Sequence, residues 1–113
     1  PIMALKTTQK LLVAESRMNS GLERIQSILK LANEVNDENV TYFQARAKSV
    51  ASLRAEFLEA LEQVQALNVL LDKEYKPSFK DLDKFDEAAA RIQMKLDIVM
   101  NLTATKPTTT VSS

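Results

Sequence analysis

The chain has 113 residues, of which 45% are hydrophobic, 27% charged and 5% aromatic, and this size and balance suit a single modest domain. It contains no Cys and no His, which excludes a disulfide framework and removes the commonest zinc ligands and the commonest general base. Its 15 basic and 15 acidic side chains cancel, so there is no electrostatic reason to expect nucleic acid or an anionic membrane as a partner.

The first predicted helix covers about residues 5–35. Its apolar residues recur every seven positions in two rows, as expected of a helix with one buried face. The rows are Leu11, Met18, Ile25 and Ala32, and then Ala14, Gly21, Ile28 and Val35. A glycine inside a helix costs about 1 kcal/mol relative to Ala. Either a neighbouring helix approaches closely at Gly21, or the glycine is merely tolerated there.

The second predicted helix covers about residues 38–75. It follows an Asn-rich break in which Asn36 or Asp37 is the expected N-cap, and Pro77 predicts where it ends. Its strict heptad rows indicate coiled-coil-like packing. We call these rows the interaction seam, because we expect them to contact a partner helix of the same chain or of another copy. The interaction seam consists of Phe43, Val50, Leu53, Phe57, Ala60, Val64, Leu67 and Leu71.

The third predicted helix covers about residues 79–102. Ser78 is its expected N-cap, with Asp81 as the acid of a capping box. Apolar residues alternate at spacings of three and four along it, which predicts one continuous buried face. These residues are Leu82, Phe85, Ala89, Ile92, Leu96 and Val99.

The two ends of the chain have a different character from this helical region, which we expect to span residues 4–102. Residues 1–3 are interpreted as a cloning remnant and a natural start at Met3, at the N-terminus of a longer protein. Residues 103–113 are rich in Thr and Ser and have almost nothing to bury, which predicts a disordered linker leading to another domain.

The fold class follows from three amphipathic helices, short breaks and a single glycine. We predict an all-α fold, either an antiparallel three-helix bundle or a long helical hairpin with a third helix alongside. No apolar run approaches the roughly 20 residues needed to span a bilayer. The expected location is the cytoplasm or the nucleus.

The sequence offers little for chemistry. Glu56 and Glu59 have the i,i+3 spacing of di-iron carboxylates, but those sites also need His, so a solvent-facing row is the expected role. One glycine cannot build the loops that hold nucleotide phosphates. We therefore predict no catalytic residue, no cofactor and no metal ligand. The aromatic residues nearest the two breaks, Tyr42, Phe43 and Phe79, either close the ends of the core or anchor a partner.

The order of several short motifs resembles that of a known family. The motifs are Lys6 with Leu11, Leu22-Glu23-Arg24-Ile25, the stretch Leu53-Arg54-Ala55-Glu56-Phe57-Leu58-Glu59-Ala60-Leu61, and Phe85-Asp86-Glu87 with Ile92 and Lys95-Leu96. Over residues 4–102 the chain resembles the N-terminal helical region of Gag-like polyproteins of BEL/Pao-type LTR retrotransposons, or a host gene derived from one. The resemblance implies a structural, self-assembling role without catalytic residues.

Three functions remain open at this point. The leading expectation is an oligomerisation module of a Gag-like protein, in which a second copy forms a dimer of ordinary size, about 800 Å² per partner. The alternatives are a monomeric spectrin-repeat-like adaptor that binds another protein, and a lipid-binding amphipathic bundle. The mixed charges of the polar faces argue against a membrane partner.

Overall fold

A computed structural model describes the backbone of residues 2–112 and the side chains of residues 5–102. The described residues form four helices and no strand: α1 (Ile2–Asn33), α2 (Val40–Ala47), α3 (Val50–Leu71) and α4 (Lys80–Ser112). The helices pack against one another, and the prediction of an all-α fold is confirmed.

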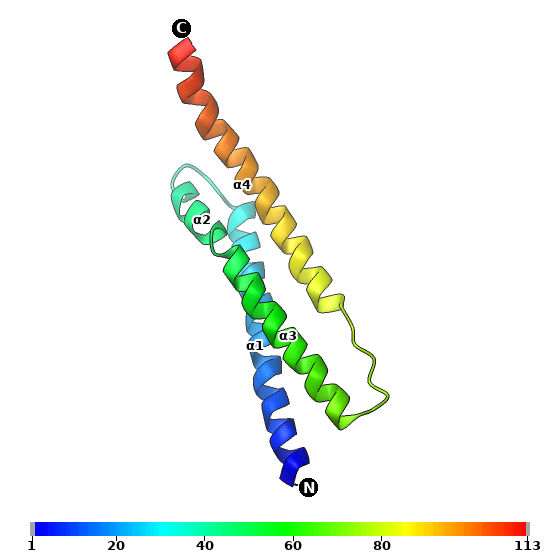
Figure 1. Ribbon diagram of the computed structural model, residues 1–113. Coiled ribbons are helices and arrows are strands. Elements are labelled where there is room, and N and C mark those ends of the chain that lie inside the picture. The colour runs from blue at the N-terminus through cyan, green and yellow to red at the C-terminus, as the bar shows by residue number, and fades with distance from the viewer. Residues whose placement is uncertain (1, 113) are drawn as a thin grey trace.

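The helices lie roughly along one direction (Figure 1). α1 and α3 run in opposite directions and make the most extensive contact, while α4 returns alongside them and packs mainly on α1. The short α2 lies at the end where α1 stops and contacts both α1 and α4. The molecule is elongated, 75 × 22 × 18 Å, with a radius of gyration of 19.3 Å. A compact domain of this length would have about 13 Å.

One apolar core joins all four helices, and no polar or charged side chain is buried among the described residues. Each helix contributes residues from the face that its apolar spacing indicates. The largest fully buried side chains are Phe43, Phe57, Phe85, Ile25, Ile28 and Ile92.

The prediction of one continuous second helix over residues 38–75 is wrong, because the helix is interrupted between α2 and α3. The hydroxyl of Ser49 donates a hydrogen bond of 2.7 Å to the carbonyl oxygen of Arg46, and the Ser49 N–H donates to the same oxygen at 3.1 Å. A serine that bonds to the preceding turn competes with the helical ladder and bends or breaks it. The heptad pattern runs through this break, so periodicity alone did not predict it.

The break before α2 is held by two asparagines. The Asn36 side-chain oxygen accepts the N–H groups of Glu38 and Asn39 at 2.8 and 3.1 Å, and the Asn39 side-chain oxygen accepts the Asn36 N–H at 2.7 Å. The N-cap of α2 is Asn39, which corrects the prediction of Asn36 or Asp37. Asn36 nevertheless uses its side chain as a cap does, one turn earlier.

The break after α3 begins earlier than Pro77 predicts. α3 ends at Leu71 because Asp72 is extended, with φ −145° and ψ 109°, and its carboxylate accepts the Glu74 N–H at 3.0 Å. At the far side of this break, the Ser78 hydroxyl accepts the N–H of Lys80, the first residue of α4, at 3.3 Å. The residue directly before α4 is Phe79, whose carbonyl accepts the N–H of Asp83 at 2.9 Å, so Ser78 lies one residue before the N-cap position that was predicted for it. Its hydroxyl nevertheless bonds to the backbone of α4 as a capping side chain does.

The backbone of α4 stays helical beyond residue 102, through Ser112, where the sequence predicts a linker. The side chains of residues 103–113 lie outside the described residues, and the linker stays a prediction. The same holds for the interpretation of residues 1–3, whose side chains also lie outside the described part.

Candidate functional site

The interaction seam lies mostly inside the chain itself. Five of its members are buried in the core: Phe43, Leu53, Phe57, Ala60 and Val64. Val50 and Leu67 are half-buried against that core, and Leu71 is exposed. Most of the seam therefore contacts helices of the same chain, and a partner would reach those residues only if the helices separated.

Phe57 is the point at which α1, α3 and α4 meet. A Cβ placed on Gly21 would lie 3.1 Å from Phe57 Cδ1 and 3.3 Å from Phe57 Cβ, so α3 passes very close to α1 there. On its other side the Phe57 ring stacks on Phe85 of α4, with centroids 4.7 Å apart and planes at 19°. Of the two interpretations of Gly21, the structure favours close approach.

A bidentate ion pair joins α3 to α4: Arg54, three residues before Phe57 in α3, binds Asp86, the residue after Phe85 in α4. Arg54 Nε donates to Asp86 Oδ1 at 2.7 Å, and Arg54 Nη2 donates to Asp86 Oδ2 at 3.0 Å. The hydrogen bonds from Arg54 lower the pKa of the Asp86 carboxyl, and its positive charge adds to this, although partial burial opposes the shift. This pair aligns the two helices.

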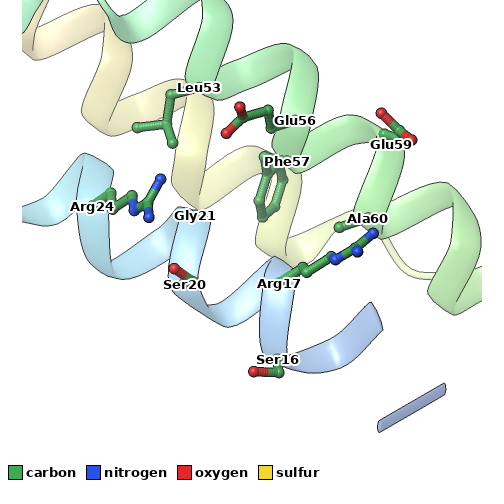
Figure 2. Close-up of a pocket in the computed structure, with 10 residues that line it drawn as sticks. All are labelled: Ser16, Arg17, Ser20, Gly21, Arg24, Leu53, Glu56, Phe57, Glu59 and Ala60. Carbon is green, nitrogen blue, oxygen red and sulfur yellow. The ribbon is translucent and has the colours of Figure 1, made fainter. Parts of the chain in front are cut away.

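A shallow groove of about 500 Å³ runs between α1 and α3 on the face that points away from α4 (Figure 2). In Figure 2, α4 is the pale yellow ribbon behind the groove. The α1 side of the groove carries Ser16, Arg17, Ser20, Gly21 and Arg24, and the α3 side carries Leu53, Glu56, Phe57, Glu59 and Ala60. Ser16, Ser20 and Gly21 on α1 and Ala60 on α3 are small residues, and their short side chains leave space along the groove.

The two edges of this groove bear opposite charge. Arg17 and Arg24 lie exposed on the α1 edge, and Glu56 and Glu59 lie exposed on the α3 edge. Within residues 5–102, none of these four side chains forms an ion pair or a side-chain hydrogen bond. The groove thus presents free charges of both signs across a floor of buried residues, Gly21, Leu53, Phe57 and Ala60.

Exposed apolar residues extend the groove toward the start of α1. Val13 lies one turn before Arg17 on α1, and Leu67 and Leu70 lie on the last turns of α3, one heptad after Ala60 and Gln63. Val13 and Leu70 are exposed, and Leu67 is half-buried. The C-terminal end of α3 also extends past the beginning of α4 (Figure 1).

A second exposed apolar surface lies on α4. Met94, Ile98 and Leu102 follow one another at i, i+4 spacing and are 65%, 53% and 64% exposed. We call these three residues the α4 ridge. Met94 comes two residues after buried Ile92, which turns it about 200° around the helix and away from the core. The α4 ridge was not predicted from the sequence, although its four-residue spacing beside the buried row was a visible signal.

The described residues contain no group of three or more His, Cys, Asp or Glu placed to hold a metal ion. Of the aromatic residues at the breaks, Phe43 is in the core, whereas Tyr42 and Phe79 are exposed.

None of the helices, over the residues described, is long and apolar enough to cross a membrane.

The chain was compared with protein-family models, curated proteins and solved structures, and none of them matches it.

Proposed function

We propose that this chain is a structural interaction module that mediates self-assembly. The observation that carries the proposal is the α4 ridge: three large apolar side chains, each more than half exposed, in a row on one face of a helix. An exposed apolar surface with polar residues around it is typical of a site of protein association. Among residues 5–102 the apolar core is complete without the ridge, which leaves these three side chains exposed for another chain.

Two further points support this function. The resemblance to the N-terminal helical region of BEL/Pao-type Gag-like polyproteins implies self-assembly, and such a protein would act in the cytoplasm or the nucleus. The finer architecture that we propose is an antiparallel three-helix bundle of α1, α3 and α4 with coiled-coil-like packing. In such a bundle the outer face of each helix is available for contact between copies.

The test is the solution mass of the full chain by light scattering, from low to high micromolar concentration. We expect the mean mass to rise above that of one chain as the concentration increases. Ile98→Asp places a charge on the α4 ridge and should weaken association at least tenfold, while helicity measured by circular dichroism stays unchanged. A single-chain mass at every concentration would overturn the proposal and favour a monomeric adaptor.

A further inference from the structure

We propose that the groove between α1 and α3 receives the α4 ridge of a second copy of this chain, so that copies join through two different surfaces and stack head to tail. This inference deepens the proposed self-assembly and rests on it. It names both surfaces, and it replaces a closed symmetric pair by a directional contact.

The two surfaces lie on opposite faces of the molecule. α4 packs with its buried face, which includes Phe85 and Ile92, toward α1 and α3, and its ridge points the other way. The groove opens on the side of α1 and α3 that faces away from α4 (Figure 2). A copy that docks its ridge in one groove leaves its own groove free for the next copy.

The charges of the two surfaces are complementary. Along α4, Arg91 and Lys95 lie on one flank of the ridge, and Asp97 lies on the other flank, because residues two apart are turned by about 200°. Arg91 also pairs with Glu87 at 3.1 Å and Asp97 accepts a hydrogen bond from Gln93 at 2.8 Å, both at the exposed surface, so docking would exchange or share these contacts. The groove likewise has a basic edge and an acidic edge. One of the two possible directions of the docked helix therefore places the basic flank of α4 against Glu56 and Glu59 and Asp97 against an arginine of α1.

The shapes and apolar parts also correspond. The ridge is a row with i, i+4 spacing, and rows of this kind pack into the matching grooves of neighbouring helices. Ser16 and Ser20 repeat at the same spacing along the α1 side and leave room for larger side chains. The exposed side chains of Val13 and Leu70 at the end of the groove offer apolar area for the third residue of the ridge.

Because the groove and the α4 ridge lie on opposite faces of the molecule, two copies cannot make both contacts with each other, so this contact does not close in a dimer. Copies add one after another, and they form a filament or, if the rotation between copies closes, a ring. A symmetric dimer would instead use the same surface twice and stop at two copies.

The decisive experiment uses two full-length variants, each lacking one surface. The ridge variant carries Met94→Asp and Ile98→Asp. The groove variant carries Arg17→Glu and Arg24→Glu. All four positions are exposed, so both variants should keep the circular dichroism spectrum of the wild type. The control is Met100→Asp, an equally exposed position that lies two residues after Ile98 and is turned away from the ridge.

Light scattering of each variant and of their mixture distinguishes the possibilities. We expect each variant alone to be a single chain, the control to associate as the wild type does, and the 1:1 mixture to give a complex of two chains that grows no further. Loss of association in the ridge variant alone, or association of both variants as in the wild type, overturns the head-to-tail contact while self-assembly stands. A wild type that stays a single chain at high micromolar concentration overturns both.

Discussion

Phe57 lies between the Cα of Gly21 in α1 and the ring of Phe85 in α4, so the spacing of three helices depends on one side chain. A methyl group on Gly21 would press on Phe57 Cβ, which is attached to the backbone and moves only if α3 moves. The stacked Phe85 ring blocks the alternative of turning Phe57 aside.

The first prediction concerns Gly21→Ala. Alanine is favoured by about 1 kcal/mol in a helix, whereas overpacking a core costs about 1–3 kcal/mol. We expect the free energy of unfolding, measured by urea denaturation, to fall by up to about 2 kcal/mol. Asn19→Ala is the control, because Asn19 is exposed in the same helix and gains propensity without a clash. A stabilisation of Gly21→Ala equal to that of the control would show that α1 and α3 have room to spare.

The second prediction concerns Asp86, whose folded-state pKa is lowered from the ordinary 3.8 by the hydrogen bonds of Arg54. Because the pKa is lowered, the ion pair stabilises the fold at any pH above the ordinary pKa of Asp. This contribution disappears as the pH falls through the folded-state pKa. Asp86→Asn should destabilise the chain slightly at pH 7, because both partners are partly exposed.

The measurement is the difference in free energy of unfolding between wild type and Asp86→Asn, from pH 7 down to pH 2. We expect the difference to shrink below about pH 4 and to vanish at the acid end. Glu87→Gln is the control, since Glu87 pairs with Arg91 within the same helix at 3.1 Å. A difference that is constant with pH would contradict the role of the ion pair.

At the scale of helices, α2 is a short element that the chain places across the end of the core. Phe43 is 0% exposed and its neighbour Tyr42 is 55% exposed, although both are aromatic residues next to a break. Arg46 donates to the Tyr42 hydroxyl at 3.0 Å on the outer surface, so Tyr42 has a local polar contact in place of a core contact.

The third prediction compares these two aromatic residues. Phe43→Ala removes a fully buried ring and should lower the free energy of unfolding by about 3–5 kcal/mol. Tyr42→Ala should lower it by less than about 1 kcal/mol, as is usual for exposed positions. Thermal and urea unfolding followed by circular dichroism measure both. Equal losses at the two positions would show that α2 does not close the core.

The apolar spacing predicted the buried faces of α1, α3 and α4 well, because period and burial are directly linked in a helix. It did not predict the break between α2 and α3, since that break depends on the hydroxyl of Ser49 and a carbonyl of the preceding turn, with no Gly or Pro to signal it. The early end of α3 has a similar local cause in the side chain of Asp72.

At the scale of the whole molecule, the helices are displaced along one another, and this displacement decides which apolar residues stay uncovered (Figure 1). The groove could not be derived from the sequence, whereas the α4 ridge left a signal in its four-residue spacing. Periodicity identifies the apolar face of a helix, but not how far a neighbouring helix covers it. The interaction seam was therefore placed on residues that the chain itself buries.

The fourth prediction concerns shape. At concentrations low enough for a single chain, small-angle scattering should give a radius of gyration near 19.3 Å. The displaced helices and the long α4 produce this value, well above the roughly 13 Å of a compact domain. Deleting residues 103–113 should lower it, because the helical residues 103–112 lie at one extreme of the long axis (Figure 1). A value near that of a compact domain would contradict the arrangement of the helices.

The close contact of Gly21 with Phe57 also has a consequence for synthesis on the ribosome. The two residues are 57 − 21 = 36 positions apart, so α1 emerges with its apolar face bare before α3 exists to cover it. At about 5–20 residues per second, that interval lasts roughly 2–7 s. During this time the nascent α1 is a surface for chaperones, and on a crowded polysome it lies within reach of the same helix on neighbouring nascent chains.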